Sequence, residues 1–149
     1  MDKETMRQIE WDCSRLVLSF YRYLDEKRYE DLVQLFDEDG SWDRLGEPLV
    51  GRQRIRETMN EREDWLTAHV VTNLMVDVVD ENNANTVQYI TLYRHQGWDE
   101  SRGPAPVVLP LGVLRHRDAL VRVGDEWKFK RKTSRAIMVN RERVTHYDK

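Results

Sequence analysis

The sequence predicts one α+β domain, with helices in its first part and an antiparallel sheet in the remainder. Up to about residue 64, apolar residues recur every three or four positions, as they do in amphipathic helices. Beyond that point they form the runs and alternations of strands, separated by polar turns. Helices followed by hairpin-connected strands are typical of domains whose helices cover one face of a curved sheet.

The composition indicates a soluble globular protein. The 149 residues include 34% charged and 40% hydrophobic residues and carry a net charge of -3, which does not fit a disordered chain or a polyanion-binding one. No repeat or linker divides the sequence. We predict a single domain over residues 1–139 and a charged tail over residues 140–149.

The amino terminus and the single cysteine favour a cytoplasmic protein. Cys13 falls within an apolar helical pattern, so a packed thiol is a better interpretation than a reactive one. The first residues lack the apolar stretch of a signal peptide, and no apolar run is long enough to span a membrane. We therefore expect no membrane partner.

The first predicted helix covers about residues 4–27 and carries a continuous apolar stripe. Tyr21 and Asp25 lie one turn apart and border that stripe, so both side chains can lean into whatever the helix covers. A solvated acid near a helix end is an equally good interpretation of Asp25. The stripe consists of Ile9, Cys13, Leu16, Val17, Phe20 and Leu24.

Two shorter helices follow. The first is predicted over residues 29–36 and is ended by the turn-forming sequence of residues 37–40. Residues 41–43 could begin a strand, and residues 46–51 are predicted to form a loop. The third helix is predicted over residues 52–64, with Ile55 and Met59 facing inward.

Four longer strands make up the predicted sheet, and their alternation assigns side chains to faces. His95 falls on the face opposite Leu92 and Arg94, and Lys132 falls on the face opposite Phe129. A β-bulge in the last strand would reverse that assignment for Lys132. The strands are predicted over about residues 70–79, 86–96, 112–123 and 126–139, with a long loop over residues 97–110.

Several segments, taken together and in order, resemble the SnoaL-like branch of the nuclear transport factor 2-like (NTF2-like) superfamily. The resemblance extends over nearly the whole chain and implies a cone-shaped α+β fold, in which a bent sheet surrounds a pocket closed by the first helices. The segments are residues 24–32, 35–42, 51–55, 69–73 and 118–129.

The resemblance also implies a set of site residues. Scytalone dehydratases and hexachlorocyclohexane dehydrochlorinases in this superfamily pair an aspartate from the first helix with a histidine on the strand after the third, and Asp25 and His69 fall on that pair. Trp42 falls where the dehydrochlorinases have a pocket tryptophan, and Lys132 lies near their pocket arginine. Leu24 departs from the pattern, because scytalone dehydratases have a tyrosine immediately before the aspartate. His95 could correspond to their second histidine.

These residue types suit proton abstraction from carbon. Imidazole titrates near neutral pH, so His69 is the candidate base, and Asp25 would hold its tautomer and stabilise the imidazolium. A leaving group would need a donor or a positive charge opposite the base. Candidate substrate-binding residues are Tyr21, Trp42, His95, His116 and Lys132.

The predicted function is therefore a cofactor-independent lyase of the dehydratase type, or an isomerase, acting on a small hydrophobic molecule. Two alternatives stay open. One is a non-catalytic assembly module like the β subunits of ring-hydroxylating dioxygenases, which share the fold. The other is a small-molecule carrier that uses the same pocket without turnover.

Other chemistries lack their sequence signatures. No histidine pair has metal-ligand spacing, and the chain has neither a glycine-rich phosphate loop nor a Gly-x-Ser-x-Gly elbow, so we expect no metal and no cofactor. The basic run over residues 128–135 alternates with aromatic residues, which favours a solvated strand face over a nucleic-acid site. By resemblance, we expect a homodimer or homotrimer.

Overall fold

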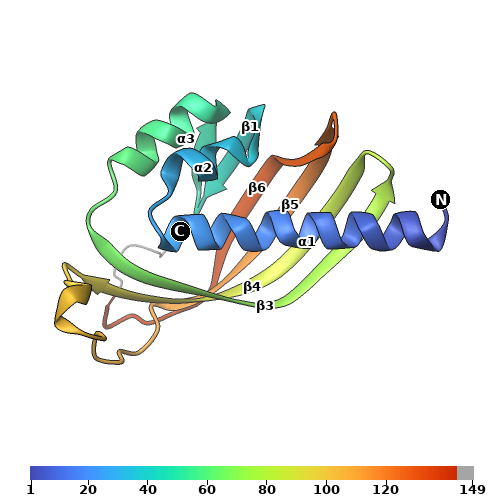
Figure 1. Cartoon of the computed structure of the whole chain (residues 1–149). Helices are drawn as coiled ribbons and strands as arrows, with labels where there is room; N and C mark the ends of the chain where they lie inside the picture. The colour runs from blue at the N-terminus through green and yellow to red at the C-terminus, as the bar shows by residue number, and fades with distance from the viewer. Residues whose placement is uncertain (144–149) are drawn as a thin grey trace.

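The structure is a computed structural model that describes residues 1–143. Three α-helices and a six-stranded sheet make up the fold, which is α+β as the sequence predicts. Figure 1 shows α1 lying across the sheet, while α2 and α3 pack at the end formed by β1 and β2. The elements are α1 (Lys3–Asp25), α2 (Tyr29–Gln34), β1 (Phe36–Arg44), β2 (Glu47–Val50), α3 (Gly51–Asn60), β3 (Trp65–Asp80), β4 (Asn83–Gln96), the short 3-10 helix η1 (Glu100–Arg102), β5 (Gly112–Val123) and β6 (Glu126–Val139).

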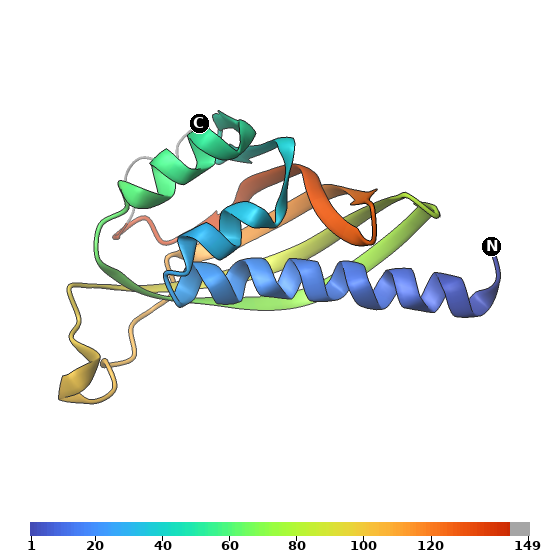
Figure 2. The ribbon, with the colours of Figure 1, turned by 45° about the horizontal axis from the view of Figure 1, so that its top comes forward.

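Helix α1 begins at a side-chain cap and buries the predicted apolar stripe. The Asp2 carboxylate accepts a hydrogen bond from the backbone N–H of Thr5 at 2.8 Å, which satisfies one of the free donors of the first turn. Cys13 is fully buried in the stripe, as expected for a packed thiol. Both views of the ribbon (Figures 1 and 2) show α1 running along one side of the curved sheet. Among the described residues, no helix has both the length and the apolar character needed to cross a membrane.

The sheet is curved and does not close on itself. Its strand order is β2-β1-β6-β5-β4-β3, with β1 parallel to β6 and the other neighbours antiparallel. In β3 the register shifts between Thr72 and Met75, and Asn73 adopts a left-handed φ of 53°. Such an irregularity bends a strand and helps the sheet to curve around α1.

The segment before β2 differs from the prediction. Residues 37–40 form part of β1 instead of a turn, and the second helix ends at Gln34 instead of residue 36. The backbone N–H of Phe129 donates to the carbonyl oxygen of Leu35 at 2.9 Å, and a Cβ on Gly40 would lie 2.6 Å from the Phe129 carbonyl oxygen. Pairing with β6 thus overrides the local turn preference, and Gly40 permits the close approach.

Other boundaries also differ from the prediction. Residues 47–50, predicted as loop, form the edge strand β2 because they pair with β1. Helix α3 ends at Asn60 instead of residue 64, and β3 begins earlier than predicted, at Trp65. The last two strands have the predicted bounds. Of the predicted tail, residues 144–149 lie outside the described part of the chain.

A bulge in β6 decides which way Lys132 points. Ala119 pairs with Arg131 and Leu120 pairs with Phe129, so Lys130 is an extra residue in β6. The extra residue reverses the alternation beyond it, and Lys132 therefore faces the core, on the same side as Phe129. Its side chain is fully buried.

Candidate functional site

The last residue of α1 meets an early residue of β3. Asp25 Oδ1 lies 2.5 Å from His69 Nδ1, and Asp25 Oδ2 accepts the backbone N–H of His69 at 2.9 Å. Thr67, two residues before His69 and on the same face of β3, donates its hydroxyl to Asp25 Oδ1 at 2.8 Å. The carboxylate therefore has three donors, which hold it and the imidazole in one relative orientation.

The contact has a defined tautomer. A carboxylate only accepts hydrogen bonds, so the ring proton of neutral His69 lies on Nδ1 and is donated to Asp25. Nε2 then carries the free lone pair. The side chains are partly sheltered, with 8% of His69 and 26% of Asp25 exposed, so the pair lies at an edge accessible to a small molecule and is not sealed in the core.

His69 lines a pocket of about 320 Å³ between α1, α3 and the sheet. The interior wall includes Phe20, Leu24 and Leu114, and Trp42 completes it from β1. His116 also lines the pocket, from β5. Charged and aromatic residues at the pocket include Arg44, Glu47, Glu61, Arg62, Glu63, Trp65 and Arg94.

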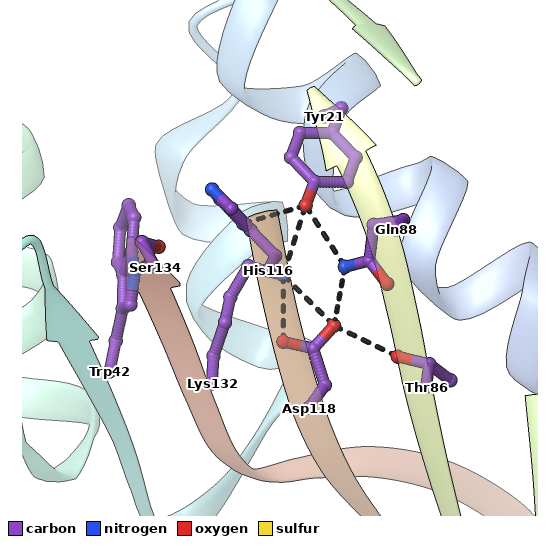
Figure 3. Close-up of polar contacts among 8 residues, drawn as sticks. All are labelled: Tyr21, Trp42, Thr86, Gln88, His116, Asp118, Lys132 and Ser134. Carbon is purple, nitrogen blue, oxygen red and sulfur yellow. Dashed lines mark hydrogen bonds and ion pairs between the residues drawn. The ribbon is translucent and has the colours of Figure 1, made fainter. Parts of the chain in front are cut away.

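A second polar cluster is buried between α1 and the sheet (Figure 3). Asp118 and Lys132, each with a side chain that is 0% exposed, form an ion pair at 3.1 Å. Thr86 and Gln88 of β4 donate to Asp118 at 3.1 and 2.8 Å. Buried charges need such partners, because an unpaired ion in the interior is strongly destabilising.

Tyr21 connects this cluster to the pocket. Its hydroxyl oxygen lies 2.7 Å from His116 Nδ1, 3.1 Å from Gln88 Nε2 and 3.3 Å from Lys132 Nζ. The Tyr21 ring also contacts the His69 ring, with 5.9 Å between centroids. We call the cluster of Tyr21, Thr86, Gln88, His116, Asp118 and Lys132 the buried network.

Burial dominates the electrostatics of the buried network. It lowers the pKa of His116 well below its usual value, and the positive charges of Lys132 and of a protonated His69 lower it further. Burial also lowers the pKa of Lys132, although the Asp118 carboxylate opposes that change. The pKa of Tyr21 is raised well above its usual value, first by burial and then by Asp118.

The structure brings some of the sequence-predicted residues to the pocket and places others elsewhere. Asp25 touches His69, while Trp42 and His116 line the pocket wall. Trp42 is held by an Nε1–H donated to Ser134 Oγ at 3.0 Å. Tyr21 and Lys132 belong to the buried network and do not line the pocket. His95 lies on the other face of β4, where its ring contacts Trp98 at 5.2 Å.

Sequence reasoning missed several polar residues of the site. Thr67 and Asp118 each lie two positions from a candidate histidine, so strand alternation places them on the same face. That spacing was the available signal. For Thr86 and Gln88 the only signal was strand alternation, which places both on one face of β4. In residues 1–143, no group of three His, Cys, Asp or Glu side chains is arranged to hold a metal ion.

Known structures share the fold at low sequence identity. A Novosphingobium aromaticivorans protein named "Putative Scytalone Dehydratase" superposes with a TM-score of 0.77 at 23% identity, over 96% of this chain and 93% of its own. An NTF2-like protein with a cystatin-like fold from Novosphingobium aromaticivorans gives 0.70 at 17% identity, over 85% and 80%. A "Putative Aromatic Ring Hydroxylase", also from Novosphingobium aromaticivorans, gives 0.70 at 21% identity, over 89% and 93%.

At these identities the structural likeness establishes the fold alone. No curated protein has a significant sequence match to the chain. Family assignment comes instead from the sequence model of the SnoaL-like domain, which matches residues 7–133 and so includes most of α1, most of the pocket and the first part of β6. The chain belongs to the SnoaL-like domain family.

Proposed function

We propose that this protein is a cofactor-independent isomerase or dehydratase that abstracts a proton from a small hydrophobic substrate, with His69 as the base. One observation carries the proposal: the 2.5 Å contact between His69 Nδ1 and Asp25 Oδ1 at the wall of the pocket. It leaves the basic nitrogen, Nε2, as the ring atom available to a bound molecule.

Asp25 would assist His69 in two ways. It keeps the proton on Nδ1, so that Nε2 stays the acceptor, and its negative charge stabilises the imidazolium that forms when a proton is taken up. Because three donors hold the carboxylate, neither side chain has to reorganise during the transfer.

The pocket supports a substrate of modest size and largely apolar surface. Its volume of about 320 Å³ lies near the lower end of the range of roughly 300–1,000 Å³ for small-molecule sites. Phe20, Leu114 and Trp42 would pack against the hydrocarbon part. In this proposal Tyr21 and Lys132 act on the substrate only through other residues, since neither lines the pocket.

A hydrogen-exchange experiment tests the base without requiring the natural reaction. The protein is incubated in D₂O with a panel of hydrophobic ketones and hydroxylated cyclic compounds, and loss of carbon-bound protons is followed by NMR. We expect exchange in at least one compound, reduced about 10²–10⁴-fold in His69→Gln and strongly reduced in Asp25→Asn. His95→Gln, which alters a histidine outside the pocket, is the matched control and should exchange normally.

The same experiment separates the two alternatives. Binding of these compounds without exchange or elimination, in the wild type and in His69→Gln alike, would favour a carrier. An assembly module of the dioxygenase type would co-purify with a larger iron-sulfur subunit and would show neither effect. The predicted homodimer or homotrimer is tested separately, by light scattering of the purified chain.

A further inference from the structure

We infer that His116 is a second substrate-contacting group: a neutral imidazole whose Nε2–H donates a hydrogen bond to an oxygen of the substrate. The substrate class that fits is a hydrophobic ketone or enone with an acidic C–H beside its carbonyl group. The inference rests on the proposed function, because it assumes that His69 removes the proton. His116 is then the group that stabilises the negative charge developing on the substrate oxygen.

Asp118 determines the orientation of the Gln88 amide. Its amide lies against Asp118 Oδ2 at 2.8 Å and against Tyr21 Oη at 3.1 Å. A carboxylate can only accept hydrogen bonds, so the amide nitrogen must face Asp118. The same NH₂ group therefore donates to the oxygen of Tyr21.

The hydroxyl proton of Tyr21 has one possible acceptor among the three polar neighbours of its oxygen. The oxygen accepts from Gln88 Nε2 and from the ammonium group of Lys132, which uses both of its lone pairs. Its third neighbour is His116 Nδ1 at 2.7 Å. Because the other two neighbours are donors, Nδ1 is the only one of the three that can accept the hydroxyl proton.

The contact with Tyr21 determines the tautomer of His116. With Nδ1 accepting from Tyr21, a neutral His116 carries its proton on Nε2. That nitrogen is buried and has no hydrogen-bond partner among the described residues, and its ring lines the pocket. Figure 3 shows Nε2 on the side of the ring that points away from the Tyr21 hydroxyl. A buried donor without a partner costs free energy, unless a ligand satisfies it.

The electrostatic surroundings keep His116 neutral. The groups facing it are Tyr21 from α1, His69 from β3, Lys132 from β6 and Asp118 from its own strand. Burial and the positive charge of Lys132 lower its pKa well below 6.5. A neutral imidazole is a poor proton donor but a good hydrogen-bond donor, so it suits an enolate better than a leaving hydroxide.

His69 and His116 would together form and stabilise an enolate. His69 Nε2 takes the proton from the carbon beside the carbonyl, and the C–H electron pair becomes the new C=C bond. The π pair of the carbonyl moves to oxygen, which becomes an enolate that accepts the His116 Nε2–H. Return of the proton from His69 to another carbon of the conjugated system gives the isomer, without an oxidant or a cofactor.

Nitrogen NMR of the wild-type protein tests the tautomer without requiring activity or a variant. Long-range ¹H–¹⁵N correlation spectra, assigned through ring-to-Cβ connections, distinguish a protonated from an unprotonated ring nitrogen. We expect His116 to carry its proton on Nε2 and to stay neutral from pH 6.5, where a free imidazole is half protonated, to pH 8. A proton on Nδ1, or an imidazolium form within this range, would overturn the inference.

A binding comparison tests the donor with a matched pair of ligands. Equilibrium dialysis at neutral pH measures how much more tightly the protein binds 2-naphthol, which carries an enol-like oxygen, than naphthalene, which has none. We expect this affinity ratio to fall about tenfold in His116→Asn, since one hydrogen bond to the pocket is lost. The side-chain carbonyl of the introduced asparagine can still accept from Tyr21, which protects the fold.

His95→Gln, which alters a histidine outside the pocket, is the matched control. The ratio should survive in that variant. If the ratio falls in His69→Gln and survives in His116→Asn, the donor is not His116. Failure of the proposed function looks different: His69→Gln would then leave proton exchange unchanged, while the His116 tautomer and the naphthol ratio remain as expected.

Discussion

Two histidines face the same pocket, and α1 holds each of them through a different side chain. Asp25 accepts from His69 Nδ1, whereas Tyr21, one turn earlier, lies against His116 Nδ1. A carboxylate neighbour makes Nδ1 a donor and leaves Nε2 as a base. A phenol neighbour that has its own donors makes Nδ1 an acceptor and leaves Nε2 as a donor. The position of the proton on each imidazole is therefore determined by the group that contacts its Nδ1.

The two regions also differ in exposure to water. Asp25 is 26% exposed, whereas Asp118 and Lys132 are 0% exposed. Interactions in the dry region have large consequences for folding, because an unpaired charge there finds no water. Interactions at the pocket edge have smaller consequences for folding and should matter mainly for the proposed proton transfer.

The largest effect on stability is expected from Asp118→Ala. It leaves the fully buried ammonium of Lys132 without its counter-ion, and removing one partner of a buried pair costs about 3–5 kcal/mol. Urea denaturation at pH 7 measures the free energy of unfolding. Asp25→Asn should lower the free energy of unfolding clearly less. Equal losses of stability in the two variants would contradict the contrast between the pocket edge and the buried network.

Two further variants control this prediction. Combining Asp118→Leu with Lys132→Met removes both charges, so it should recover much of the loss seen in Asp118→Ala. Glu26→Gln removes an exposed partner of Arg22, and we expect no measurable change. A double variant as unstable as Asp118→Ala would mean that packing around the cluster, and not the unpaired charge, causes the loss.

A lower pH is expected to have an intermediate effect on the free energy of unfolding. In the unfolded chain His116 binds a proton near pH 6.5, whereas in the folded protein its pKa lies well below that value because of burial and Lys132. Below pH 6.5 the unfolded chain therefore binds more protons, and stability falls as the pH is lowered. One such group contributes a slope of up to about 1.4 kcal/mol per pH unit.

The pH effect is measured by comparing urea denaturation of the wild type and His116→Asn between pH 7 and 5. The variant should show a flatter dependence over this range, while His95→Gln should follow the wild type. Parallel curves for the wild type and His116→Asn would mean that His116 is not held neutral by the fold.

Much of the fold could be predicted from the sequence, because strand alternation and turn residues are local signals. The bounds of β5 and β6 follow from the alternation on either side of the turn at Gly124. The start of β1 could not be predicted in this way. Residues 37–40 have the composition of a turn, and only their pairing with β6, a partner far along the chain, makes them a strand.

The candidate site likewise has residues that the sequence indicates and others whose position depends on tertiary structure. Spacing on α1 indicated that Tyr21 and Asp25 border the inward stripe, but it left a solvated Asp25 equally open. The family resemblance indicated His69 as the partner of Asp25. The inward position of Lys132 depends on the bulge at Lys130, which no local pattern determines. The link from Tyr21 to His116 depends on tertiary packing between α1 and β5, so the sequence could name both residues without joining them.

The smallest effect is expected from Thr67→Val. Its hydroxyl donates to the same Asp25 oxygen that contacts His69, at 2.8 Å. The isosteric valine keeps the pocket shape and removes only this donor, while the backbone N–H of His69 still holds Asp25 Oδ2. We expect proton exchange to slow by no more than about tenfold, the value of one hydrogen bond.

Thr67→Ser is the matched control, since it retains the hydroxyl and should exchange at close to the wild-type rate. If proton exchange instead slowed as much in Thr67→Val as in His69→Gln, the Asp25 carboxylate would depend on Thr67 for its position. His69 alone would then not hold it. If Thr67→Val and Thr67→Ser were equally slow, the methyl group, and not the hydroxyl, would be the part that matters. The pocket edge would then resemble the buried network, where a single contact cannot be removed without disturbing its neighbours.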